Sequence, residues 1–216
     1  MSIQVTTQET FDITKLSIGS TFSRNEMRFI TLLYDQKPMY LKTPAMRVPF
    51  KPNQFSATSK WSINLEISDQ CALLQANLTQ LDQWMIEQGV KSCVEWLGAK
   101  PEKPYSTEVV AGKYTNTLKE SKDPRYPPSI RANFKNRGSE LLTHVYDHNS
   151  QPVDVGLENN QTHLSQVIKQ NTQLAVLLTP SLWANTEKGT FGVSWSIEQA
   201  KIYPSPSTKQ VLENLM

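Results

Sequence analysis

Two of the three histidines lie close together in the sequence and are the first residues to test for chemistry. His144, Asp147 and His148 have the spacing of a small metal cluster, because imidazole and carboxylate groups both bind metal ions. The same stretch also fits the end of a strand running into a solvated turn, which is the simpler interpretation. We therefore expect no metal site.

Signatures of catalysis are missing from the rest of the chain. The patterns GxxxxGK[ST], GxGxxG and GxSxG do not occur, so phosphate transfer, dinucleotide binding and serine hydrolysis have no support. Cys71 and Cys93 are the only cysteines and form no CxxC pair, which predicts reduced side chains without zinc or a disulfide. We expect a binding protein with no cofactor, and not an enzyme.

Basic residues are interleaved with aromatic ones along the chain, which is the combination that binds a single nucleic-acid strand. Cations contact the phosphates, and aromatic rings stack on unpaired bases at about 1–3 kcal/mol per base. The predicted contacts with single-stranded DNA are Tyr40, Lys42, Arg47, Phe50, Lys51, Lys60, Lys113, Tyr114, Arg125, Tyr126, Arg131, Lys135 and Trp183.

Each aromatic residue also has a structural explanation. Trp61 and Trp195 occupy alternating positions of predicted strands and fit a core role better, and Trp84 and Trp96 fit packing between a helix and the sheet. Trp183 differs, because it falls in a polar loop where a large ring has little reason to be exposed. Arg125 and Tyr126 could also simply fasten a proline-rich connection to the domain.

Positive charge is concentrated in two segments. Residues 24–60 carry seven basic and two acidic residues, and residues 100–137 carry nine basic and four acidic ones. Each segment is therefore +5 in a chain of net charge +2, which leaves −8 for the remainder. If the segments meet in space, they form the positive face of a polyanion-binding protein.

Strand patterns dominate both ends of the chain. We expect one hairpin that turns at Lys37-Pro38, and a second near the C-terminus whose loop, PSLWANTEKG, contains Trp183. Alternating or β-branched residues predict strands at 26–34, 39–43, 60–67, 130–135, 141–146, 172–179 and 190–203.

Helical periodicity occupies the middle of the chain. Leucines at three- and four-residue spacing predict an amphipathic helix over 69–88 that begins at Ser68-Asp69, presents Leu73 on its apolar face and ends at Gly89. Shorter helices are expected over 90–97 and from Ser106. The main helix carries no lysine or arginine, which argues against reading of a DNA major groove.

Strands in runs around one helical block predict a mainly β (α+β) protein, and we favour an OB-fold-like antiparallel barrel. We expect an N-terminal extension over 1–23, a single domain over 24–204 with the helical insertion at about 69–120, and a C-terminal tail over 205–216. No apolar run approaches the ~18–20 residues of a membrane span, and the N-terminus lacks signal-peptide features. A soluble, intracellular protein is expected.

The order of these segments resembles the single-stranded-DNA-binding proteins of short-tailed phages and their relatives in nucleo-cytoplasmic large DNA viruses, with the viral branch closer. The segments that carry the resemblance are MYLKTPAMRVPF, KWSINLEI, EWLGAKPEKPYSTEVVAGKY, SKDPRYPPSIRANF, VYDHNSQPVDV and TQLAVLLTPSLWANTEKGTFGVSWSIEQAKIY.

The resemblance implies an OB barrel that coats single-stranded DNA during viral DNA replication, recombination or repair. It also implies partners such as a polymerase or helicase-primase at the site of viral replication in the infected host cell. By the same resemblance, Lys42-Thr43-Pro44 with Arg47, the region 113–131 and the Trp183 loop correspond to parts of the family that line the binding groove.

One departure from the family concerns the tail. Phage members end in a long acidic tail, whereas PSPSTKQVLENLM contains Glu213 as its only acidic side chain. The sequence admits either a monomer or a homodimer, and either DNA or RNA as the bound strand. The alternative from another class is a virion structural protein, a minor capsid or scaffold component with a β-sandwich fold.

Overall fold

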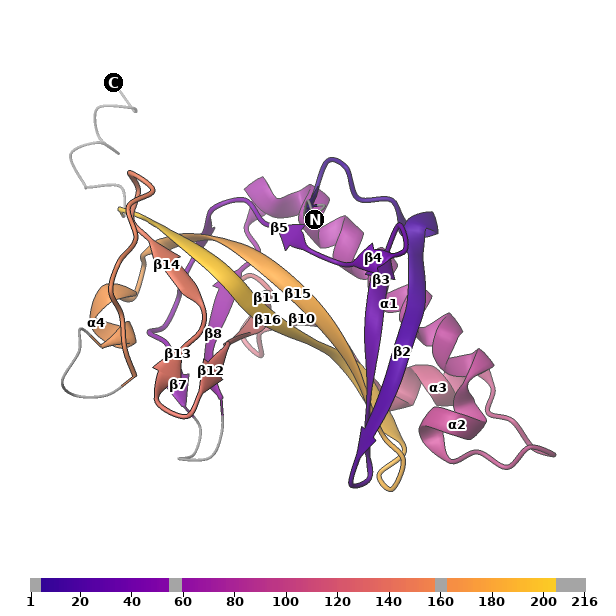
Figure 1. Cartoon of the computed structure of the whole chain (residues 1–216). Coiled ribbons are helices and arrows are strands. Elements are labelled where there is room, and N and C mark those ends of the chain that lie inside the picture. The colour runs from indigo at the N-terminus through magenta and orange to yellow at the C-terminus, as the bar shows by residue number, and fades with distance from the viewer. Residues whose placement is uncertain (1–4, 55–59, 158–162, 205–216) are drawn as a thin grey trace.

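The computed structural model describes residues 5–54, 60–157 and 163–204 (Figure 1). Its helices are η1 (Ile13–Lys15), η2 (Asp69–Cys71), α1 (Ala72–Lys91), α2 (Cys93–Leu97), α3 (Thr107–Lys113) and α4 (Leu164–Val167). Its strands are β1 (Thr6–Thr7), β2 (Leu16–Arg24), β3 (Met27–Tyr34), β4 (Lys37–Pro38), β5 (Leu41–Lys42), β6 (Met46–Arg47), β7 (Asn53–Gln54), β8 (Trp61–Glu66), β9 (Tyr114–Thr115), β10 (Leu118–Lys119), β11 (Ser129–Phe134), β12 (Asn136–Arg137), β13 (Glu140–Leu141), β14 (His144–Tyr146), β15 (Gln173–Asn185) and β16 (Thr190–Tyr203).

The long hairpin of β15 and β16 is the spine of the sheet and runs diagonally through the molecule (Figure 1). On the edge that faces away from β16, β15 pairs antiparallel with β3, β5 and β6. On the edge that faces away from β15, β16 pairs with β9, β11 and β14, and all three of these ladders are parallel. Strands from the N-terminal part and from the middle of the chain therefore meet on one hairpin near the C-terminus.

The mainly β fold with a helical block is confirmed, but the predicted antiparallel barrel is not. The hydrogen-bonded path over the described residues runs from β1 through β5, β15, β16, β11 and β8 to β7, and the mixed sheet does not close on itself. Instead of a backbone ladder, an ion pair joins β6 to β8, with Arg47 Nη1 2.9 Å from Glu66 Oε2. Three parallel neighbours along β16 are the physical reason for the difference from an all-antiparallel barrel.

The N-terminal segment takes part in this sheet. Residues 1–23 are expected to lie outside the domain as an extension, yet β2 pairs with β3 along most of its length and β1 pairs with β5. The tail predicted over 205–216 lies outside the described residues.

The predicted helices are present with different details. α1 buries Leu74, Leu78 and Leu81 against the sheet, but Leu73 points away and is exposed, which corrects its predicted place on the apolar face. Gly98 ends α2 in a left-handed conformation at φ +67°, as the sequence predicts. Within the described ranges, no helix has both the length and the apolar character that crossing a membrane requires.

Gly89 does not end the main helix as predicted. α1 continues to Lys91, and Gly89 is buried where a Cβ atom would lie 2.5 Å from Phe191 Cζ and 2.9 Å from Val110 Cγ1. This glycine therefore allows a close approach of the helix to the sheet.

Both predicted hairpins turn elsewhere than expected. The first turns at Asp35 and Gln36, which have positive φ, and only Lys37–Pro38 return along β3, because Leu41–Lys42 pairs with β15. In the second hairpin β15 continues to Asn185. Trp183 consequently lies inside a strand, opposite Gly192 and Phe29, and its predicted loop position is wrong.

Candidate nucleic-acid interface

The faces of β8 and β11 that point away from the core carry polar side chains in register. Arg131 lies opposite Asn64, and Asn133 lies opposite Ser62, in an antiparallel ladder. Because side chains alternate along a strand, the residues between them point to the other face, where they are buried and apolar. This polar face forms a floor that is cationic at Arg131.

Two segments flank this floor on opposite edges. Residues 49–51 lead into β7, which pairs with β8 on the edge away from β11. Lys119 ends β10, which pairs with β11 on the edge away from β8, and residues 120–127 follow it. Parts of the two basic segments of the sequence therefore meet across the same pair of strands, which meets the condition for one positive face.

Between the two flanks the surface is hollowed. Hollows of about 200 and 510 Å³ have Phe50, Asn64 and Lys119 in common, so they form one continuous depression. We call it the basic groove and define it by Arg47, Phe50, Lys51, Asn64, Lys119, Tyr126 and Arg131.

The groove carries more positive than negative charge. Four of its lining residues are basic, namely Arg47, Lys51, Lys119 and Arg131, and two are acidic, Glu66 and Glu120, which leaves +2. The pairing of Arg47 with Glu66 partly neutralises one end. The excess charge consequently comes from Lys51, Lys119 and Arg131, less that of Glu120.

Lys119 and Arg131 are close enough to affect each other electrostatically. Burial first, and the charge of Arg131 second, lower the pKa of Lys119. Within the described ranges neither side chain forms an ion pair with a carboxylate. Two cations held together without an acid between them form a site that an anion would stabilise.

Hydrogen bonds hold Arg131 in place. Its Nη2 donates to Ser62 Oγ at 2.9 Å, and Ser62 Oγ donates to Asn53 Oδ1 at 3.3 Å. A guanidinium group has five N–H donors, so several others remain for a ligand. Arg47 is held more tightly, because it donates both to Glu66 and to Asn171.

Two aromatic rings line the groove while largely open to solvent. Phe50 is 63% exposed and Tyr126 is 61% exposed, and they come from the two opposite flanks. Exposure of large rings is unfavourable in water, so rings at such positions often mark a binding surface. Arg125, beside Tyr126, is tied to Asp123 by an ion pair of 2.6 Å.

Four other predicted contacts lie outside the groove lining. Lys60 is exposed and lies just before β8. Lys135, just after β11, is paired with Glu198. Lys113 Nζ lies 5.1 Å from the ring centroid of Tyr105, near the tip of the β15–β16 hairpin. Tyr114 is a correction, because it is buried and donates its hydroxyl to Asp82 Oδ1 at 2.6 Å, which makes it part of the core.

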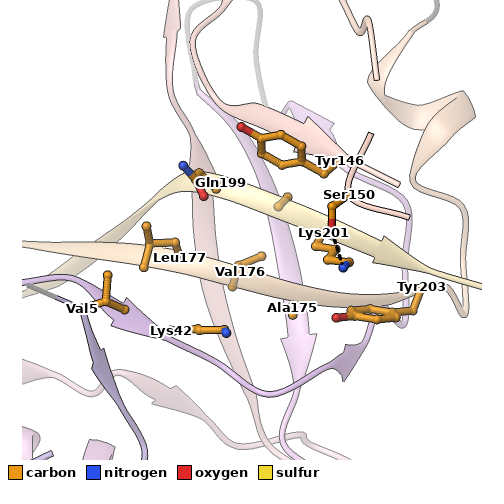
Figure 2. Close-up of a pocket in the computed structure, with 11 residues that line it drawn as sticks. Val5, Lys42, Tyr146, Ser150, Ala175, Val176, Leu177, Gln199, Lys201 and Tyr203 are labelled. Carbon is orange, nitrogen blue, oxygen red and sulfur yellow. Dashed lines mark hydrogen bonds between the residues drawn. The ribbon is translucent and has the colours of Figure 1, made fainter. Parts of the chain in front are cut away.

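Lys42 lines a different hollow, and the half-buried Tyr40 stands two residues before it. This hollow has a volume of about 460 Å³, a floor of small and apolar side chains from β15, and Lys201 on β16 (Figure 2). Lys201 Nζ donates to Ser150 Oγ at 2.7 Å and lies 5.5 Å from the ring centroid of Tyr203. The structure thus does not bring Lys42 into the basic groove.

Sequence reasoning missed part of the groove. Lys119, Ser62, Asn64 and Asn53 are not among the predicted contacts. The alternation in KWSINLEI could have identified Ser62 and Asn64, because it assigns them to the face opposite the buried isoleucines. Lys119 was counted in the second basic segment but has no aromatic neighbour in the sequence.

The histidine cluster has no support as a metal site. In the part of the chain that the structure describes, no group of three or more histidine, cysteine, aspartate or glutamate side chains is arranged to hold a metal ion. His144 is exposed on β14, and His148 lies in the turn that follows.

Comparison with known proteins gives similarities of structure only. No protein-family model matches the chain, and no curated protein matches its sequence. Among solved structures, the chain is similar to a C-terminal truncation of the single-stranded DNA-binding protein from bacteriophage Enc34, at 10% identity and a TM-score of 0.46 over 88% of this chain and 95% of that one. The same Enc34 protein in complex with ssDNA is 12% identical, with a TM-score of 0.47 over 88% and 95% of the two chains.

A further similar structure is gp2.5, a single-stranded DNA-binding protein encoded by bacteriophage T7. It is 12% identical, with a TM-score of 0.48 over 77% of this chain and 92% of that one. Identity is low and the three TM-scores are below 0.5, so we take neither a role nor a site residue from these structures. The expected closeness to the branch from large DNA viruses stays a prediction.

Proposed function

We propose that this chain binds single-stranded DNA in the basic groove, without regard to base sequence. The observation that carries the proposal is the pair of exposed rings, Phe50 and Tyr126, on opposite flanks of a floor where Lys119 and Arg131 lie together without an acidic partner. Cations and accessible rings together are what a single strand needs from a binding surface.

The roles of the groove residues follow from their chemistry. Arg131, Lys119 and Lys51 contact phosphates, which fixes the path of the strand but carries no sequence information. Phe50 and Tyr126 stack on bases, and stacking accepts any base because each has a π face. Asn64 supplies an amide on the floor that can bond to a sugar, a phosphate or a base edge.

A duplex fits this arrangement poorly. The residues of the groove come from strands and loops, and the main helix offers no basic face for a major groove. Stacked base pairs would also leave Phe50 and Tyr126 without partners. We infer a protein that coats exposed strands during viral DNA replication, recombination or repair, and that has no catalytic step of its own.

Fluorescence anisotropy of labelled oligonucleotides tests the proposal. Oligo-dT, its duplex with oligo-dA and an oligo-rU strand of equal length are titrated with the protein at two salt concentrations. The proposal requires tighter binding of oligo-dT than of the duplex, weakening as salt rises. Equal or tighter binding of the duplex contradicts it, and a preference for oligo-rU assigns the groove to RNA. Absence of binding to all three favours the virion structural protein.

A further inference from the structure

Three aromatic residues form a row on the outer face of the sheet, away from the basic groove. Phe22 on β2 lies opposite Phe29 on β3, and Phe29 lies opposite Trp183 on β15. The two phenylalanine rings are stacked, with centroids 5.2 Å apart and planes inclined by 20°. We call Phe22, Phe29 and Trp183 the aromatic row.

Trp183 is held in the row by a glycine on the next strand. Gly192 faces Trp183 across the β15–β16 ladder, and a Cβ atom on Gly192 would lie 3.1 Å from Trp183 Cζ2. The indole therefore lies close over the backbone of β16, where only a glycine leaves ordinary van der Waals distance. The result is a fixed, half-buried ring beside two others, and not a side chain that moves freely.

The outer end of the row is open to solvent. Phe22 is 60% exposed and lies in the second half of β2, where residues 20–24 are all exposed. Phe29 stacks against one side of this ring. A ring that is exposed beside two other aromatic rings offers a face on which an unpaired base can stack.

A polar path connects the row to the basic groove on the same face. Asn133 Nδ2 donates to Ser194 Oγ at 3.1 Å, and Ser194 lies opposite Ser181 in the hairpin. Ser181 in turn lies opposite Thr31 on β3. Amide and hydroxyl groups line this path, and none of these four residues carries a negative charge that would repel phosphate.

The distance between the basic groove and the aromatic row suits one continuous ligand. From Arg131 to Trp183 the face crosses two strand spacings of about 4.8 Å and about two residues of 3.3 Å along the strands, which is roughly 12 Å. Phe22 lies about two further spacings away. A strand held in the groove therefore reaches the row within a few nucleotides.

We propose that the aromatic row is a second base-stacking surface, onto which a single strand continues after it leaves the basic groove. This inference rests on the proposed function, because it names a further part of the same binding surface. Single-stranded DNA is the occupant that the observations favour, because the row is continuous with a cationic groove through uncharged hydrogen-bonding side chains. A second copy of the chain is the other occupant that the exposed edge of β2 would admit.

The test compares oligo-dT of two nucleotides, which is too short to occupy both the groove and the row, with oligo-dT of twenty on Phe22→Ser, Trp183→Phe and Arg131→Ala, each in the full chain. Phe22→Ser should weaken binding of the long strand at least fivefold and leave binding of the short one unchanged, whereas Arg131→Ala should weaken both. Leu73→Ser is the matched control, because it also removes an exposed apolar side chain and lies on α1.

Fluorescence gives a second readout that does not depend on folding of the Phe22 variant. The long strand should quench tryptophan emission of the natural chain more than that of Trp183→Phe, and the short strand should quench both equally. Unchanged affinity of Phe22→Ser for the long strand overturns the inference. So does a dimer, measured by sedimentation, that Phe22→Ser converts to a monomer, because the row is then covered by a second copy. If neither strand binds the natural chain, the proposed function itself fails and this inference falls with it.

Discussion

Arg131 Nη2 donates a hydrogen bond of 2.9 Å to Ser62 Oγ, which joins the outer faces of β11 and β8. Ser62 is buried, so the guanidinium is anchored at one corner while other N–H groups remain available above the floor. The neighbouring Lys119 completes the cationic pair. Positioning of this kind costs little ordering entropy on binding, because the side chain is already held.

Removal of the cationic pair should weaken DNA binding uniformly. Arg131→Ala and Lys119→Ala should each lower the affinity for oligo-dT about five- to tenfold at low salt. Each should also reduce the slope of log affinity against log salt by about 0.7, the value for one phosphate contact on a single strand. Anisotropy titrations at four salt concentrations measure both effects.

Lys91→Ala is the matched control, because it removes one exposed positive charge at the end of α1, outside the groove. It should leave the slope unchanged. A slope that falls equally in the control would show that net charge, and not the groove, governs binding. A change in base preference for Arg131→Ala would show base readout instead of phosphate contact.

The two exposed rings should contribute by stacking. Phe50→Ala and Tyr126→Ala should each cost about 1–3 kcal/mol of binding free energy for any homopolymer. Phe50→Tyr and Tyr126→Phe keep an aromatic face and should retain most of the affinity. Equal losses in the alanine and the aromatic variants would argue that these residues only shape the loops.

Gly89→Ala should destabilise the fold. The added methyl group would meet Phe191 and Val110 at 2.5 and 2.9 Å in a buried contact, and overpacking of this kind costs about 1–3 kcal/mol. Gly112→Ala is the control, since no atom lies within 4 Å of its Cβ position and alanine favours the helix by up to about 1 kcal/mol. Urea denaturation measures both, and a neutral Gly89→Ala would disprove the tight contact.

Loss of the Tyr114 hydroxyl should make stability depend more strongly on pH. Burial raises the pKa of Asp82 above its ordinary value of 3.8, although hydrogen bonds from Thr117 and Tyr114 oppose this shift. A raised carboxyl pKa means that the stabilising contribution is fully present below pH 3.8 and is lost as pH rises through the folded-state pKa. Tyr114→Phe removes a donor to the carboxylate and raises that pKa further.

The cost of Tyr114→Phe should therefore be small near pH 3 and about 1.5–3 kcal/mol at pH 7, where the buried charge lacks one hydrogen bond. Urea midpoints across this range provide the measurement. Tyr146→Phe serves as control, because Tyr146 is half-buried and no hydrogen bond of its hydroxyl is seen in the described structure. A pH-independent loss for Tyr114→Phe would contradict this account of Asp82.

Local patterns in the sequence predicted the strands and helices well where burial is one-sided. The alternation from Trp61 to Ile67 predicts β8 and its polar face, and the leucine spacing predicts α1. Gly89 deviates because its contact with the distant residue Phe191 decides its role, and Leu73 deviates because it lies at the exposed side of α1.

Pro180 explains why the sequence placed Trp183 in a loop. Proline normally marks the end of a strand, yet here it lies within β15 opposite Trp195. β3 pairs with β15 from Ser181 onward and β5 pairs with it up to Leu178, so Pro180 stands in the gap between them, where its missing N–H breaks no ladder on that edge. The parallel ladders of β16 were equally hidden, because pairing direction depends on connections between distant segments.

The groove could be predicted from the sequence only in part, because local sequence shows which residues are basic or aromatic but not which distant segments meet. Charge segregation shows where positive charge lies along the chain but not whether the two basic segments meet, and the structure brings Arg47, Phe50, Lys51, Tyr126 and Arg131 together from them. Local sequence does not show that Tyr114 is buried and donates a hydrogen bond to Asp82, or that Lys42 lines a separate hollow.

Ultraviolet crosslinking of the protein to oligo-dT, followed by mass spectrometry of the joined peptides, tests the central claim most directly. The groove predicts crosslinks at Phe50 and Tyr126 that disappear when unlabelled single strand competes and persist when duplex competes. Crosslinks confined to the Lys42 and Lys201 hollow, or spread evenly over the surface, would contradict the groove as the site of single-stranded DNA binding.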